Sequence, residues 1–234
     1  MNYRMISYVL GWIMVFEAAF MTVPLITAAV FAEGNSALWF GVSAAVCLVI
    51  GGLLILVKKP QNKQLFSREG FVIVALSWIL LSLFGALPLF LSGAIPYFID
   101  ALFETVSGFT TTGASILSDV EALPKSMIMW RSFTHWVGGM GVLVFIMAFL
   151  PLSGGQNMHI MKAESPGPSV SKLVPRVKTT ALLLYSIYFV LTLVEFVMLL
   201  CGGMTGFEAL NTAFSTAGTG GFGFYNDSMA RFSP

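Results

Sequence analysis

Long apolar stretches separated by short polar segments dominate this chain. A helix that crosses the hydrocarbon core of a bilayer needs about 20 mostly apolar residues. Five stretches reach that length, at residues 6–31, 37–57, 71–91, 126–150 and 180–200. The pattern predicts an all-α, polytopic membrane protein.

Two further apolar segments, residues 97–109 and 207–214, are too short or too polar to span a membrane. Segments of about 10–14 residues are candidates for re-entrant half-helices. Each is followed by a loop rich in glycine and threonine, at residues 110–118 and 215–223. Non-helical backbone survives at membrane depth only where protein or a water-filled cavity satisfies its polar groups.

The order of span, short helix and Gly/Thr loop occurs twice, which indicates an internal repeat. The matching pairs are Thr105/Thr212, Thr112/Thr219, Gly113/Gly220 and, after a shift of one residue, Asp100/Glu208. A single such loop is most simply an ordinary external loop. Two matching loops, each after a short apolar helix, favour a shared function.

That function is suggested by backbone chemistry. Glycine adopts positive φ without a Cβ clash, so a glycine-rich strand can turn successive carbonyls toward one axis. A ring of carbonyls replaces the hydration shell of a monovalent cation in potassium-channel filters. The C-terminal ends of the short helices carry partial negative charge, which also favours a cation. The two loops are therefore candidate filter strands.

Composition agrees with a lipid environment. Apolar residues make up 57% of the chain and charged residues 10%, whereas soluble domains average about 45–50% and roughly 25%. The net charge of +1 comes without a basic stripe, so no nucleic-acid partner is expected. The sequence has no cluster of histidine, cysteine or acidic residues at matching depth, so we expect neither an enzyme nor a cofactor. His135 and His159 lie too far apart for a metal site.

Basic residues predict the orientation. They concentrate between the second and third spans and between the fourth and fifth: Lys58, Lys59, Lys63, Arg68, Lys162, Lys172, Arg176 and Lys178. Cytoplasmic loops carry an excess of lysine and arginine. This places the N-terminus and both basic loops in the cytoplasm and both short segments on the outer side.

A charged residue inside a membrane span costs free energy, and such residues are usually paired or functional. Arg131 lies near the start of the span after the first loop, and we expect an ion pair with Glu104 or Asp119 that holds that loop. The alternative is a side chain that extends to the outer interface. Glu17 and Glu195 are isolated carboxyl groups in apolar spans, with no partner visible in the sequence.

The two loops, together with Trp130-Arg-Ser-Phe-Thr-His-Trp-Val-Gly-Gly-Met-Gly141, resemble the Trk/Ktr/HKT superfamily of potassium transporters. The helix pair at residues 6–57 resembles the additional N-terminal pair of TrkH-type members. The resemblance implies four helix–pore helix–helix repeats around one pore, each contributing a re-entrant filter loop. Carried over by residue, the potassium-binding filter positions are Thr111, Thr112, Gly113, Ala114, Gly218, Thr219, Gly220 and Gly221.

In plant members, serine in place of the first-repeat filter glycine accompanies sodium selectivity. The corresponding residue here is Gly113, which favours potassium. Potassium, as the transported substrate, is the only metal that the resemblance implies.

Four segments follow from this assignment. We expect an N-terminal helix pair at 1–66, a first repeat at 67–155, a cytoplasmic loop at 156–178, and a second repeat at 179–234 that is cut before its closing helix. Two strands cannot encircle an ion, so we expect this chain alone not to conduct.

The expected function is potassium uptake across a bacterial inner or plasma membrane. The resemblance also implies a homodimer in membrane lipid and a cytosolic nucleotide-binding regulatory subunit of the Trk/Ktr type. The alternative is a cation-coupled secondary transporter with discontinuous helices. That class would need an inverted repeat, whereas both short segments here fall on one side.

Overall fold

The structure is a computed structural model that describes residues 2–57, 67–141 and 177–232, and all regular secondary structure within these ranges is helical. The helices are α1 (Tyr3–Phe20), α2 (Thr22–Val30), α3 (Gly34–Val57), α4 (Ser67–Gly85), α5 (Leu87–Leu91), α6 (Phe98–Phe109), α7 (Lys125–Gly139), α10 (Val177–Cys201), α11 (Gly206–Ala217) and the 3₁₀ helix η2 (Ser228–Phe232). The predicted all-α class is confirmed.

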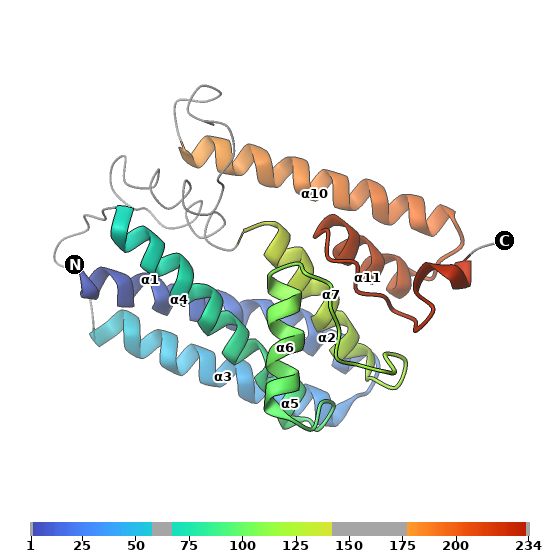
Figure 1. Ribbon diagram of the computed structural model, residues 1–234, viewed down its shortest axis with the longest axis horizontal. Helices are drawn as coiled ribbons and strands as arrows, with labels where there is room; N and C mark the ends of the chain where they lie inside the picture. Colours follow the sequence, from blue (N-terminus) through green and yellow to red (C-terminus); the bar gives the residue numbers. More distant parts are fainter. Residues whose placement is uncertain (1, 58–66, 142–176, 233–234) are drawn as a thin grey trace.

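Four helical stretches are long and apolar enough to cross a membrane. They are Tyr3–Val30, Gly34–Leu56, Arg68–Leu91 and Ala181–Cys201. They correspond to four of the five predicted spans. α1, α3 and α4 lie together along the long axis of the molecule, α10 lies at the opposite side, and α6, α7 and α11 lie between them (Figure 1).

Two of these stretches contain a break that the apolar pattern did not predict. α1 gives way to α2 at Met21, and α4 gives way to α5 at Ala86. Each break lies just before a proline, Pro24 or Pro88. Proline has no backbone N–H and its ring clashes with the carbonyl four residues earlier, which interrupts the helix at that point.

The remaining predicted span, the fourth in the chain at residues 126–150, is corrected by the structure. α7 begins at Lys125 but ends at Gly139, and Gly141 has a φ of +67° with its N–H bonded to the Gly138 carbonyl at 2.9 Å. A left-handed glycine after the last turn is a common way for a helix to end. The rest of that predicted span, nearly all of the predicted cytoplasmic loop and most of the basic residues used for orientation lie outside the described residues.

The N-terminal helix pair packs through small residues. α1 lies along α3, and a Cβ on Gly51 of α3 would lie 2.7 Å from the carbonyl oxygen of Gly11 in α1. A Cβ on Gly11 would lie 2.9 Å from the carbonyl oxygen of Gly51. Small residues let helix backbones approach closely, and the resulting van der Waals packing favours helix association in lipid.

Glu33 joins this pair to the first repeat. It lies in the turn between α2 and α3, and its carboxylate accepts bonds from the backbone N–H groups of Lys125 at 2.7 Å and Ser126 at 3.0 Å. These are free N–H groups at the first turn of α7, where a negative charge also interacts favourably with the helix dipole. The start of α7 is thereby fixed to the N-terminal pair.

Both short segments are helices of the expected kind. α6 covers the predicted segment 97–109 almost without change, whereas α11 is longer than the predicted 207–214. α11 begins with a capping box, in which the Thr205 hydroxyl oxygen and the Glu208 carboxylate each accept a hydrogen bond from the other residue's backbone N–H. α6 packs on α4 and α7, and α11 packs on α7 and α10.

We predict that Gly51→Leu will weaken the α1–α3 contact. The added side chain meets the backbone of Gly11, and such overpacking costs about 1–3 kcal/mol. The measurement is the thermal unfolding temperature of the full-length protein in detergent, with Gly52→Leu as the control, because a Cβ there meets nothing within 4 Å. Equal unfolding temperatures for the two variants would contradict the packing argument.

Candidate ion-binding site

Two loops with the same unusual backbone follow the two short helices. After α6, Thr111 and Gly113 have φ values of +55° and +76°; after α11, Thr219 and Gly221 have φ values of +61° and +76°. Positive φ in a β-branched threonine is rare and costs on the order of 1–3 kcal/mol. The same strained pattern at both places indicates that the surrounding structure enforces it.

Hydrogen bonds at the helix ends repeat as well. The Thr111 N–H bonds to the Gly108 carbonyl at 3.0 Å, and the Thr219 N–H bonds to the Thr216 carbonyl at 2.8 Å. One residue later, the N–H groups of Thr112 and Gly220 bond to the carbonyls of two equivalent serines. These are Ser107, at 2.9 Å, and Ser215, at 3.1 Å.

These equivalences correct the alignment of the repeats by one residue. Gly113 corresponds to Gly221 and Thr112 to Gly220, so Gly113 does not correspond to Gly220 as the sequence indicated. In this alignment the same number of positions separates Asp100 from Glu208 and each loop residue from its counterpart. The shift of one residue within the repeat is no longer needed. The shared Thr-Gly dipeptide was misleading, because residue identity does not specify which position carries positive φ.

The loops contact each other through their backbones. A Cβ on Gly113 would lie only 1.8 Å from the carbonyl oxygen of Gly220. The structure thus brings together the middle of the two candidate strands, which are more than a hundred positions apart in the chain. Gly113 is required here both for its positive φ and for this close approach.

α7 supports both loops from behind. A Cβ on Gly138 would lie 2.2 Å from the Phe109 carbonyl oxygen at the end of α6. A Cβ on Gly218 would lie 2.3 Å from the carbonyl oxygen of His135 in α7. Glycines on both sides therefore let one helix contact the C-terminal ends of α6 and α11.

A buried ion pair fixes the first loop. Of the two carboxylates considered as partners for Arg131, Glu104 of α6 is the one beside it, with an Nη2–Oε1 distance of 2.6 Å. Glu104 also accepts bonds from the Ser115 hydroxyl at 3.0 Å and from the Ile116 N–H at 3.1 Å. Arg131 in turn donates to the Ser115 oxygen at 3.2 Å. The pair connects α6, α7 and the segment that follows the first candidate strand.

The segments that follow the two candidate strands meet at Asn226. Its side chain donates to Asp119 at 2.8 Å and accepts from the Val120 N–H at 2.8 Å. The bond from Asn226 lowers the pKa of Asp119 below its ordinary value, and a bond from the Tyr225 hydroxyl lowers the pKa of Glu208. Both carboxylates are therefore ionised at neutral pH.

Two residues of this region, His135 and Phe222, were not predicted from the sequence to belong to the site. His135 is fully buried, and a Cβ on Gly220 would lie 2.3 Å from its Cε1 atom. The ring of Phe222 stacks on the imidazole with 4.0 Å between centroids. The available signal was the spacing of Arg131 and His135, which places both on one face of α7.

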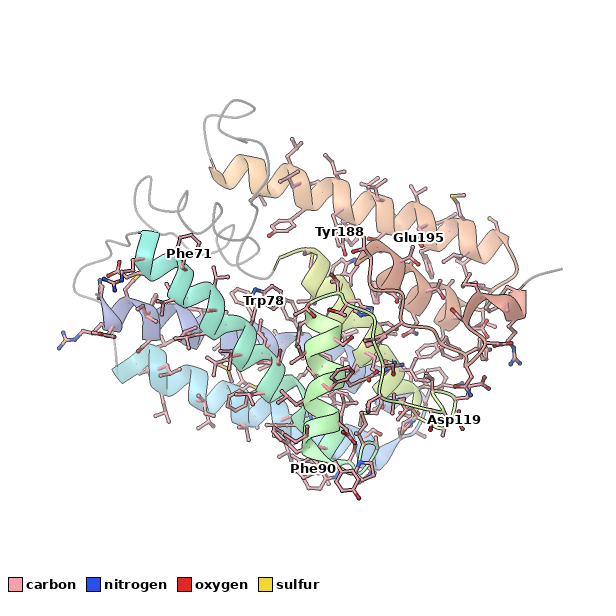
Figure 2. All side chains as sticks on the ribbon, in the orientation of Figure 1. Phe71, Trp78, Phe90, Asp119, Tyr188 and Glu195 are labelled. Carbon is pink, nitrogen blue, oxygen red and sulfur yellow. The ribbon has the colours of Figure 1, made fainter. Side chains whose placement is uncertain are left out.

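The two isolated carboxyl groups differ in their surroundings. Both oxygens of Glu17 are buried and lack a hydrogen-bond partner among the described residues. Glu195 of α10 lies close to Thr216 of α11, and Figure 2 shows Glu195 and Tyr188 on the side of α10 that faces α11. The Tyr188 hydroxyl donates to the Trp136 carbonyl at 3.1 Å, so α10 is fastened to α7.

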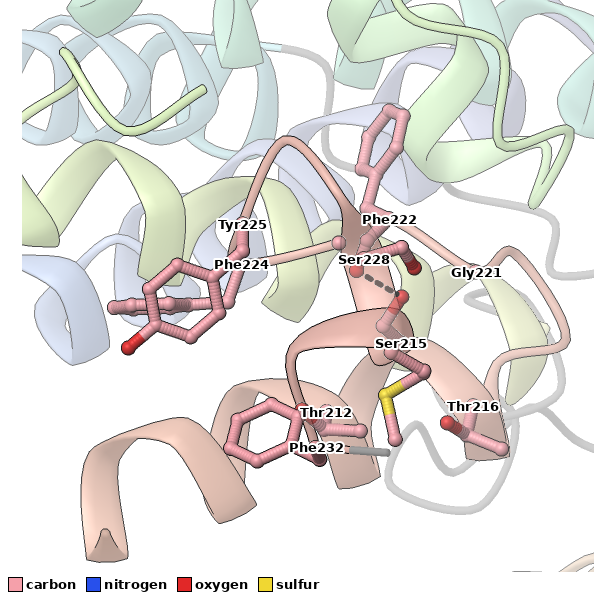
Figure 3. A pocket seen from close by; sticks show the side chains of 11 residues that line it. Thr212, Ser215, Thr216, Gly221, Phe222, Phe224, Tyr225, Ser228 and Phe232 are labelled. Atoms are coloured by element: carbon pink, nitrogen blue, oxygen red, sulfur yellow. Dashed lines mark hydrogen bonds between the residues drawn. The ribbon is translucent and has the colours of Figure 1, made fainter. Parts of the chain in front are cut away.

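A pocket of about 160 Å³ lies on the other side of the second loop, between α11 and η2 (Figure 3). It is lined by Thr212, Thr216, Tyr225 and Phe232, among others. The Ser215 hydroxyl donates to the Phe222 carbonyl at 2.8 Å at its edge. Among the described residues, no group of three or more histidine, cysteine, aspartate or glutamate residues is placed to hold a metal ion.

Membrane-spanning helices with two re-entrant helix–loop units define a polytopic membrane protein of the transporter class. Residues 40–234 match the family TrkH, described as cation transport protein, and the chain belongs to that family.

Similar proteins of known identity support this family assignment. The chain is 38% identical to the Trk system potassium uptake protein TrkH of Halomonas elongata and 36% identical to TrkH of Escherichia coli K12. Each alignment covers 99% of this chain and 48% of the relative. The crystal structure of the potassium transporter TrkH from Vibrio parahaemolyticus is similar, with a TM-score of 0.83 and 31% identity, and the match covers 100% of this chain and 47% of that one. The chain thus spans about half the length of these relatives.

We predict that removing one partner of the buried ion pair will destabilise the protein strongly. Arg131→Met leaves the Glu104 charge buried and unpaired, which costs about 3–5 kcal/mol. The double variant Arg131→Met/Glu104→Gln should recover part of that loss, because no lone charge remains. The measurement is thermal unfolding of the full-length protein in detergent.

The matched control is Arg231→Met, which removes an exposed arginine that lies over Tyr225. A surface substitution of this kind is usually within about 0.5 kcal/mol of neutral. Equal losses at Arg131 and Arg231, or fully additive losses in the double variant, would show that the pair does not hold the loop.

Proposed function

We propose that the full-length protein takes up potassium through a pore whose filter includes the two Gly/Thr loops of this chain. The observation that carries the proposal is the repeated strand with alternating positive φ, present after both α6 and α11, with Gly113 packed directly against Gly220. Ordinary external loops have no reason to share this strained backbone or to meet in this way.

The filter positions in this proposal are Thr111, Thr112, Gly113 and Ala114 in the first strand and Gly218, Thr219, Gly220 and Gly221 in the second. In the corrected alignment Thr111, Thr112 and Gly113 correspond to Thr219, Gly220 and Gly221. Backbone carbonyls at these positions would replace the water around a dehydrated monovalent cation. α6 and α11 both end at the strands, so the partial negative charge of their C-terminal ends favours a cation there.

Two strands do not surround an ion, and the relatives are about twice as long as this chain. We propose that two further repeats complete one pore, and that the protein acts as a homodimer in a bacterial inner membrane with its N-terminus in the cytoplasm. The relatives are named Trk system proteins, which supports association with a cytosolic regulatory subunit.

Uptake in this scheme is driven by the membrane potential, worth about 2.3 kcal/mol per charge per 100 mV. The rival class, a secondary transporter, would place its site between inverted repeats. Here the C-terminal ends of both α6 and α11 lead into strands that meet at Gly113 and Gly220, which favours the pore.

We predict that Gly113→Ser will impair selection of potassium over sodium. The new side chain meets the Gly220 carbonyl and must adopt positive φ, so the two strands are forced apart. The measurement is potassium uptake and its inhibition by sodium, with the full-length protein in a strain that lacks other potassium uptake. We expect at least a tenfold loss of potassium preference.

Gly93→Ser is the matched control, because Gly93 has a φ of +77° but open space around its Cβ position. It imposes the same backbone strain without a clash between strands, and we expect wild-type selectivity. Unchanged selectivity in Gly113→Ser would place the filter elsewhere. Failure of the wild type to take up potassium, despite insertion and a co-expressed regulatory subunit, would favour the secondary-transporter class.

A further inference from the structure

The side chain of Phe222 leaves its own repeat and enters the first one. Its ring centroid lies 4.2 Å from the Arg131 guanidinium carbon and 4.0 Å from the centroid of the His135 ring. Its Cε2 atom is 3.8 Å from the position that a Cβ on Gly108 of α6 would occupy. Figure 3 shows the ring pointing away from the pocket beside α11. Phe222 is therefore held between two side chains of α7, one helical turn apart, and the back of α6.

His135 connects this ring to the second strand itself. Its imidazole occupies the space in which a side chain at position 220 would lie, with Cε1, Nδ1 and Nε2 all within 2.4 Å of the Cβ position of Gly220. The Nδ1 atom is 3.4 Å from the Ser215 oxygen, and Ser215 donates to the Phe222 carbonyl at 2.8 Å. One imidazole thus contacts α11, the strand at Gly220 and the Phe222 ring.

The first strand has no equivalent of this arrangement. With the corrected alignment, the counterpart of Phe222 is Ala114, whose methyl group cannot reach another helix. The first strand is held instead by Glu104 and Ser115, through Arg131. Arg131 therefore serves both repeats, because it pairs with Glu104 and also covers the Phe222 ring.

From these contacts we infer that Phe222 is a positioning residue, which anchors the second strand to α7 and sets the position of the Gly220 carbonyl relative to Gly113. This inference rests on the proposed function, because the distance between the strands determines selectivity only if they form a filter. Loss of the ring frees the second strand to move away from the first. The cation site then becomes wider and discriminates less against a different monovalent cation.

The test uses Phe222→Leu in the full-length protein, with potassium uptake and its inhibition by sodium as the readout. We expect the sodium concentration that halves potassium uptake to fall at least tenfold, and Phe222→Tyr, which keeps the ring, to remain within threefold of wild type. The control is Phe224→Leu. Phe224 lies in the same loop, but its ring contacts are with Phe207 and Tyr225 of its own repeat. Wild-type selectivity in Phe222→Leu, or an equal change in Phe224→Leu, would overturn the inference.

A second readout does not depend on transport. Thermal unfolding in detergent is compared for Phe222→Leu, His135→Leu and the double variant. Because the two rings contact each other, we expect the fall in unfolding temperature of the double variant to be clearly smaller than the two single falls combined. Additive falls in unfolding temperature would show that Phe222 does not anchor the second strand, whether or not the wild type transports potassium. If the wild type does not transport potassium but the falls in unfolding temperature are non-additive, the proposed function is refuted, whereas the role of Phe222 in anchoring the second strand is supported.

If Phe222→Leu does not accumulate in the membrane, His135→Gln provides the same test. It removes the stacked ring but keeps a polar group that can reach Ser215. A tenfold shift in sodium inhibition is again expected, and unchanged selectivity would overturn the inference.

Discussion

The arrangement around the two strands depends on how closely α7 approaches the ends of α6 and α11. At Gly138 the approach is so close that a Cβ would lie 2.2 Å from the Phe109 carbonyl oxygen, and at Gly218 a Cβ would lie 2.3 Å from the His135 carbonyl oxygen. Without this packing, Arg131 and His135 would not reach the loops that they contact. Glycine at these positions is therefore a requirement of the geometry, since backbone meets backbone with no room for a side chain.

Two different kinds of interaction act on the two strands from the same face of α7. The first strand is fixed by a buried ion pair with its hydrogen bonds, which is specific in geometry but carries a large desolvation cost. The second is fixed mainly by stacked rings and packing, which are less directional. Arg131 takes part in both, because its charged group pairs with Glu104 while its face lies over Phe222. The repeats are therefore equivalent in backbone but not in the side chains that hold them.

The same contacts hold two residues with a strained backbone. Thr111 and Thr219 adopt positive φ, a conformation that a free threonine avoids. Hydrogen bonds to the last turn of each short helix, the support from α7 and the contact between Gly113 and Gly220 together offset that cost. A backbone that is held in one unfavourable shape by several independent contacts is well suited to present its carbonyls at fixed positions, as in the proposed filter.

The sequence by itself determined the class of the protein, four of its membrane-spanning stretches and the two short helices, because hydrophobic length and glycine-rich loops are local signals. It also identified Glu104 as one of two possible partners for Arg131. It did not locate the helix breaks before Pro24 and Pro88, although proline is a local signal, because continuous hydrophobicity masked them. Only the tertiary structure decided the alignment of the repeats and the roles of His135 and Phe222. Those contacts join residues far apart in the chain, and residue identity alone specifies neither which residues meet nor which position carries positive φ.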